Sequence, residues 1–294
     1  MQADRVSYAR WLGRIAVGAG VAGAVSGAAG LGTVTVMKRQ AAYARQVIGK
    51  PLGEIALKAD RTYKKSYGDR LDLLIVGDSI AAGLGAHRPK RTLGGRLARE
   101  LAKATGRTVR LTSVAEVGAE AWMISERQLP RLKPRYRPDV AVVIVGGNDV
   151  IHRVPVADSV KSLIEVIEDL KMRGATVIVG TCPDLGAIGP VRRPLKSYLS
   201  HTSKSLASAQ AEAALANGAR VVRLAEVVGP LFTSQPDEMF SIDRFHPSEL
   251  GYKRTAEALL PSLLAALGVR VDMPQGHYAP ILTASNPERH PIVS

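Results

Sequence analysis

Residues 74–83, LIVGDSIAAG, run from an apolar, partly β-branched segment directly into Gly77-Asp78-Ser79 and then into small residues. This pattern predicts a buried strand that ends at a glycine turn and is followed by a helix. Ser79 then has two interpretations, a nucleophile at the end of the strand or the cap of the next helix. Taken alone, the stretch favours the cap.

The rest of the chain after residue 70 alternates between short apolar runs and segments with helical periodicity. This alternation predicts an α/β fold with a mostly parallel five-stranded sheet, in which ligands bind beyond the carboxyl ends of the strands. The expected strands are 71–76, 109–114, 140–145, 175–179 and 220–224, and the expected helices are 93–105, 156–173, 196–217 and 248–267.

Two further polar motifs fall at expected strand ends or next to a helix start. Gly146-Gly147-Asn148-Asp149 follows the third strand, and Asp243-Arg244-Phe245-His246 precedes the last helix. An activated serine needs a base, that base needs an orienting acid, and the developing oxyanion needs donors. Each motif alone is an ordinary turn, but the three together favour Ser79 as a nucleophile.

With these motifs the chain resembles the SGNH (GDSL-type) hydrolases over residues 72–267. The resemblance implies a flavodoxin-like three-layer α/β/α sandwich with a Ser-His-Asp triad. It assigns Ser79 as nucleophile, His246 as base and Asp243 as the partner of His246. It also implies an oxyanion hole formed by the Ser79 and Gly118 backbone amides and the Asn148 side chain, with Asp78 and Gly147 in support.

The second block of the family is the poorest match. Gly118 follows a strand as expected, but Ser113 stands where an asparagine is common. Cys182 is the only cysteine, and we expect a small buried residue at a strand end rather than a catalytic thiol. His152 is expected to be a loop histidine. No metal-ligand or dinucleotide-binding motif is present, so no cofactor and no metal are expected.

The N-terminal part is organised differently. Residues 15–37 carry no charge over 23 positions, long enough for a helix that crosses a bilayer core of about 30 Å. We expect a basic tail at 1–14, a transmembrane or signal-anchor helix at 15–37 and a basic neck, amphipathic or irregular, at 38–70. The hydrolase domain is expected at 71–268 and a poorly ordered extension at 269–294.

The net charge is +14, and residues 1–70 carry twelve Lys or Arg against four Asp or Glu. The basic residues are not interleaved with aromatic ones, so nucleic-acid binding is not expected. The expected partners are an ester substrate and a membrane, contacted through residues 15–37 and the neck. The expected location is membrane-anchored or exported, at the cell envelope, although basic residues on both sides of the segment leave the side of the membrane open.

These observations predict a serine esterase or lipase that hydrolyses carboxylic esters with a short or medium acyl group. Two alternatives stay open at this point. An acyltransferase or deacylase acting on envelope glycan or lipid would use the same acyl-enzyme, and a membrane-tethered binding module would use none. The oligomeric state is not predicted.

Overall fold

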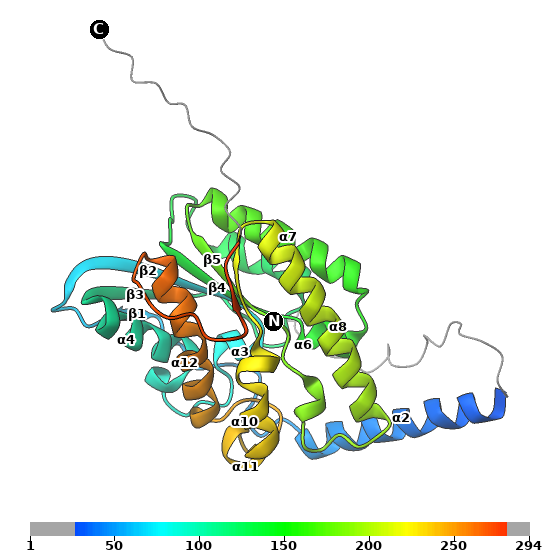
Figure 1. Ribbon diagram of the computed structural model, residues 1–294. Helices are drawn as coiled ribbons and strands as arrows, with labels where there is room; N and C mark the ends of the chain where they lie inside the picture. The colour runs from blue at the N-terminus through cyan, green and yellow to red at the C-terminus, as the bar shows by residue number, and fades with distance from the viewer. Residues whose placement is uncertain (1–26, 281–294) are drawn as a thin grey trace, which may run out of the picture.

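The computed structural model describes residues 27–280, and its centre is a mixed seven-stranded sheet (Figure 1). Five strands run parallel in the order β3-β2-β4-β5-β6, the arrangement of a flavodoxin-like doubly wound sheet. Antiparallel strands β1 and β7 pair with β3 and β6 at the two edges. In chain order the strands are β1 (Arg61–Tyr63), β2 (Gly68–Gly77), β3 (Arg107–Ser113), β4 (Val140–Ile144), β5 (Thr176–Gly180), β6 (Arg220–Val222) and β7 (His277–Tyr278).

Both faces of the sheet are covered by helices, because side chains of a buried parallel strand point alternately to two apolar layers. In β2, Leu73 and Ile75 pack into one layer, and Leu74 and Val76 pack into the other. Helices α4 (Leu93–Thr105) and α12 (Glu249–Ala266) contribute to the first layer. Helices α7 (Val156–Met172) and α8 (Leu195–Ala216) contribute to the second. The result is an α/β-hydrolase-like fold.

The starts of two of these helices follow the expected capping chemistry. The side chains of Thr92 and Ser248 accept hydrogen bonds from the backbone N–H of Gly95 and Gly251, each at 3.1 Å. Such caps satisfy amides that have no acceptor within the helix. The cap at Ser248, two residues after the turn at residues 243–246, fixes where α12 begins.

The sequence predicted five strands, whereas the sheet has seven, and the two that were not predicted are the edge strands. β1 lies in the segment expected to be a neck, and β7 lies in the segment expected to be a C-terminal extension. β1 has three residues and β7 has two, and segments this short show no strand periodicity in the sequence. Their strand conformation depends on the hydrogen-bonding edges that β3 and β6 offer.

Residues 27–37 of the expected membrane segment begin helix α2 (Gly27–Ile48), which continues well into the expected neck. Within residues 27–280 no helix combines the length and the apolarity that a membrane span requires. The remaining part of the expected segment, residues 15–26, lies outside the described residues. The carboxyl half of α2 packs against the start of α8, where Gln40 binds the Arg193 carbonyl at 2.5 Å and the Leu195 amide at 3.2 Å.

Candidate active site

Ser79 lies where β2 ends and the short helix α3 (Ser79–Ala82) begins. Gly77 permits this turn, since its φ is +134° and a Cβ there would lie 1.9 Å from the Ile144 carbonyl oxygen of β4. Asp78 is the N-cap of α3, and its Oδ1 accepts the Ile80 amide at 2.9 Å. The interpretation of Ser79 as the helix cap is therefore wrong, because Asp78 fills that role and leaves the Ser79 hydroxyl for another partner.

That partner is His246, which lies in the turn between α11 (Pro236–Met239) and α12. His246 Nε2 lies 3.0 Å from Ser79 Oγ, and His246 Nδ1 lies 2.6 Å from Asp243 Oδ2. The other carboxylate oxygen of Asp243 accepts the backbone amides of Phe245 and His246, each at 3.0 Å. The structure thus joins the three residues that the sequence proposed as a triad in one continuous line of hydrogen bonds.

The carboxylate of Asp243 is held in its charged form. Burial alone would raise its pKa, but the hydrogen bond and charge of His246, together with the two backbone amides, bring the pKa below its usual value. A carboxylate that stays charged keeps a proton on the adjacent Nδ1 of His246. The opposite ring nitrogen, Nε2, is then free to accept the hydroxyl proton of Ser79.

The expected oxyanion donors surround the same cavity as Ser79. Asn148, the second residue of α6 (Gly147–His152), borders this cavity together with Gly118, which lies in the turn after β3. One N–H of the Asn148 amide donates to the Ala119 carbonyl at 3.0 Å, and the group has a second N–H. Ser79 is the first residue of α3, so its backbone N–H has no acceptor within that helix.

Two buried carboxyl groups lie behind these donors. Burial, reinforced by the nearby charge of Asp149, raises the pKa of Asp78 to about 7. Hydrogen bonds from the amides of Ile80, Ala81 and Gly147 oppose that shift. Burial likewise raises the pKa of Asp149, whose two oxygens accept the Ala121 amide at 3.2 Å. Asp149 therefore fastens the loop that carries Gly118 to the helix that carries Asn148.

Two buried glutamines support the site, and no sequence motif predicted either of them. Gln128 binds the backbone of Gly77 twice, accepting its N–H at 2.9 Å and donating to its carbonyl at 2.8 Å. Gln210 accepts the Cys182 amide at 2.7 Å and donates to the Val145 carbonyl at 2.9 Å. Each glutamine fixes the carboxyl end of at least one strand. Both glutamines stand among other polar residues in the sequence, so no local pattern marked either of them as buried.

His152 was expected in a loop, but it is the last residue of α6 and borders the cavity of Ser79. Its Nδ1 contacts a carboxylate oxygen of Glu120, whose other oxygen accepts the indole N–H of Trp122 at 2.7 Å. Cys182 is buried, as expected, and burial raises its pKa well above the usual value. Its thiol therefore has no catalytic character.

Two cavities meet at Ser79. The larger has a volume of about 610 Å³ and extends between the site, α2 and α8. The smaller has a volume of about 80 Å³ and extends toward α10 (Gly229–Ser234). Ser79, Asn148, Ile188, Phe245 and His246 border both cavities. An ester carbonyl placed at Ser79 could therefore extend a group into each.

A hydroxyl, an imidazole and a carboxylate in this order, with amide donors beside them, are the parts of a serine hydrolase site. Within residues 27–280 no cluster of three or more His, Cys, Asp or Glu side chains could hold a metal ion.

Comparison with known proteins agrees with this class. The model of the GDSL-like Lipase/Acylhydrolase family matches residues 75–254. The GDSL-like esterase Rv1075c of Mycobacterium tuberculosis is 35% identical over 261 residues, which cover 85% of this chain and 83% of that protein. The chain belongs to the GDSL-like lipase/acylhydrolase family, and it is an ester hydrolase of the GDSL/SGNH type.

Solved structures share the fold. TesA aligns with a TM-score of 0.53 at 22% identity, over 66% of this chain and 99% of its own. The extracellular lipase of Streptomyces rimosus aligns with a TM-score of 0.52 at 18% identity, over 67% of this chain and 99% of its own. An acetyl-xylooligosaccharide esterase from Geobacillus stearothermophilus aligns with a TM-score of 0.54 at 19% identity, over 70% of this chain and 99% of its own.

Proposed function

We propose that this protein hydrolyses carboxylic esters through a covalent acyl-enzyme on Ser79. The observation that carries the proposal is the hydrogen-bonded line from Ser79 Oγ through His246 to Asp243, at 3.0 and 2.6 Å. His246 takes the hydroxyl proton while Ser79 Oγ attacks the ester carbonyl, and His246 then gives this proton to the departing alcohol. Asp243 holds the imidazole in the tautomer that allows both transfers.

The second half of the reaction uses the same groups in the reverse sense. His246 takes a proton from a water molecule, which attacks the acyl carbonyl, and the free acid leaves as the Ser79 oxygen regains its proton. Transfer of the acyl group to a sugar or lipid hydroxyl would differ only in the acceptor. The test is turnover of p-nitrophenyl esters by the full chain and by Ser79→Ala, with glycerol or glucose present. Free acid as the main product supports hydrolysis, and an acylated acceptor as the main product supports transfer.

The amide of Asn148 is proposed as an oxyanion donor, together with the Ser79 and Gly118 backbone amides. We expect Asn148→Ala to lower kcat by about 100- to 1,000-fold with a small change in KM, because the oxyanion forms only after attack. Steady-state kinetics on one p-nitrophenyl ester measure this. Asn217→Ala, at the far end of α8, is the matched control and should keep the wild-type kcat. A loss for Asn148→Ala that appears in KM alone would show that Asn148 binds substrate instead.

We also propose that the catalytic domain works outside the cytoplasm, at the cell envelope. Support comes from the sequence alone: residues 15–37 are uncharged, as in an export or anchor segment, and a long domain after such a segment translocates largely regardless of flanking charge. The expected result is that a C-terminal alkaline phosphatase fusion is active and that the protein sediments with membranes. An inactive fusion beside an active cytoplasmic reporter fusion would refute an exported domain.

A further inference from the structure

The two cavities that meet at Ser79 differ greatly in size, and they are walled by different parts of the chain. The cavity of about 610 Å³ lies within the range of about 300–1,000 Å³ that is typical of small-molecule sites. The cavity of about 80 Å³ has room for two or three water-sized groups. An ester bound at Ser79 therefore has a large cavity available for one of its groups and a small cavity for the other.

One wall of the large cavity is helix α2, which lies outside the central sheet. Val34, Met37, Ala41, Ala44 and Ile48 follow one another at the three- and four-residue spacing of a single helix face, and all five border this cavity. In Figure 1 the carboxyl-terminal part of α2 runs beside the start of α8. The apolar stripe of α2 thus forms one wall of this large cavity.

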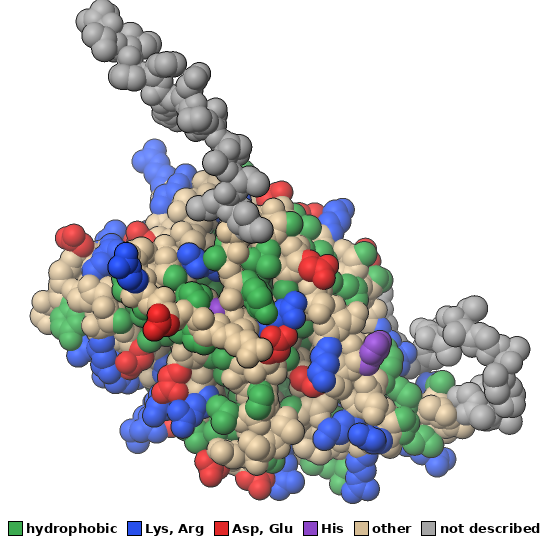
Figure 2. Space-filling model, viewed as in Figure 1, with side chains coloured by type: hydrophobic (Ala, Val, Ile, Leu, Met, Phe, Trp, Pro, Cys, Tyr) green, Lys and Arg blue, Asp and Glu red, His purple; other side chains and the backbone are tan. Residues whose placement is uncertain are grey.

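Apolar residues of two other helices line the same cavity. Ile151 of α6 and Leu195 and Leu199 of α8 border it, and they belong to one apolar cluster with Met37, Ala41 and Ile48 of α2. Exposed Lys38 and Arg153 stand at its border, and in Figure 2 basic side chains gather at the end of the molecule where α2 meets α8. A chain of methylene groups in the cavity would therefore contact apolar side chains of α2, α6 and α8.

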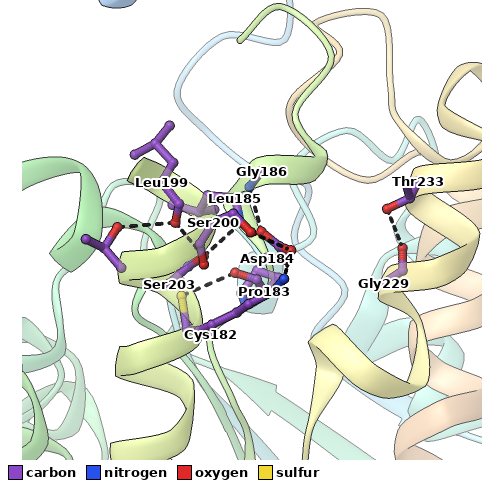
Figure 3. A network of polar contacts seen from close by, with 12 residues as sticks. Cys182, Pro183, Asp184, Leu185, Gly186, Leu199, Ser200, Ser203, Gly229 and Thr233 are labelled. Carbon is purple, nitrogen blue, oxygen red and sulfur yellow. Dashed lines mark hydrogen bonds and ion pairs between the residues drawn. The ribbon is translucent and has the colours of Figure 1, made fainter. Parts of the chain in front are cut away.

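The wall of the small cavity is fastened in place. Its segment 183–188 is tied to α8 by the Asp184 carboxylate, which accepts the Gly186 amide at 2.8 Å and the Ser200 hydroxyl at 3.0 Å (Figure 3). The Leu185 amide also donates to the Ser203 hydroxyl at 3.2 Å. Phe232 and Phe240 close the other side, with ring centres 5.0 Å apart. These contacts oppose any widening of the cavity for a larger group.

We propose that the preferred substrate is an ester with one long apolar branch, which lies between α2 and α8, and one short branch in the small cavity. This inference rests on the proposed esterase function and makes α2 a specificity element of the site. Each methylene group buried against α2 should raise kcat/KM by about three- to fourfold, until the cavity is filled. The small cavity, at about 80 Å³, does not have room for a second long branch.

Four simple esters test the two-cavity arrangement on the full chain, with acid release followed by titration. Octyl acetate and methyl octanoate place one long branch on either side of the carbonyl, ethyl acetate has none, and octyl octanoate has two. We expect the better of the two one-branch esters to exceed both ethyl acetate and octyl octanoate by at least tenfold in kcat/KM. Equal rates for all four, or octyl octanoate as the best substrate, would overturn the proposal.

Substitutions in α2 test the role of that helix. Ala41→Trp should lower the kcat/KM ratio of the better one-branch ester to ethyl acetate by at least tenfold, and Ala41→Leu should lower it less. Val47→Trp, on the exposed face of the same helix, is the matched control and should keep the wild-type ratio. An unchanged ratio in Ala41→Trp would show that α2 does not contact the substrate.

The two proposals fail in different ways. If no ester is turned over in a Ser79-dependent manner, the esterase function itself is wrong. If turnover depends on Ser79 but ignores chain length and the Ala41 substitutions, the function stands and the inference about α2 is wrong. Labelling by a small fluorophosphonate without a long alkyl linker reports Ser79 reactivity without placing a long branch in either cavity, so it separates these cases.

Discussion

Replacing Ser79 with alanine is expected to lower kcat/KM for every ester by about 10⁴- to 10⁶-fold and to abolish covalent labelling by a fluorophosphonate probe. The physical reason is that Ser79 Oγ, 3.0 Å from His246 Nε2, is the only atom that would form the acyl bond in the proposed mechanism. The backbone amide of residue 79 and the Asn148 side chain stay in place. A small residual rate from these donors is therefore consistent with the proposal.

The variant should remain folded, which makes this test clean. Asp78 and not Ser79 caps α3, so the helix start is preserved when the hydroxyl is removed. Circular dichroism and thermal unfolding check this point. Ser234→Ala, on the exposed end of α10, is the matched serine control and should keep wild-type labelling and turnover. Labelling of Ser79→Ala at the wild-type level would show that another residue is the nucleophile.

The central strands and the segment that holds Asp243 and His246 could be predicted because their signals are local. The five parallel strands are short segments rich in β-branched residues or leucine, and four of the expected helices occur with small changes at their ends. Asp243 and His246 lie three residues apart, so one turn is enough to join their side chains. Because the central strands are parallel, their carboxyl ends lie on one side of the sheet, and Ser79 at the end of β2 lies on that side.

The identity of the helix cap shows where local signals end. Asp and Ser are both good N-caps, so the sequence does not choose between Asp78 and Ser79. The choice depends on the backbone at Asp78, with φ −94° and ψ −156°, and on the close contact of Gly77 with β4. That contact joins residues far apart in the chain, and it becomes visible only in the folded sheet.

The supporting glutamines and the position of α2 lie beyond sequence reasoning for the same reason. Gln128 and Gln210 bind backbone groups 51 and 65 positions away in the chain, and neither belongs to a recognisable motif. The apolar stripe of α2 predicts that one face is covered, but not that Ser79 lies in the cavity it covers. Tertiary packing decides both.

The role of Asp243 leads to the second large expected effect. We expect Asp243→Asn to lower kcat by about 10⁴-fold while leaving the fold and the substrate affinity close to wild type. Asp243 Oδ1 accepts two backbone amides at 3.0 Å, so in the variant the amide oxygen must keep that position. The new NH₂ group then faces His246 Nδ1, where Asp243 Oδ2 stood at 2.6 Å.

An NH₂ group at that position is a donor, and it forces His246 to accept a hydrogen bond at Nδ1. The ring proton must then sit on Nε2, the atom that faces Ser79 Oγ, and Nε2 can no longer take the hydroxyl proton. Nitrogen-15 NMR of labelled histidine reports this change of tautomer directly, alongside kcat and KM. Asp237→Asn, on α11 before the same turn, is the matched control and should change neither. A kcat for Asp243→Asn within tenfold of wild type, with Nδ1 still protonated, would show that Asp243 does not set the tautomer of His246.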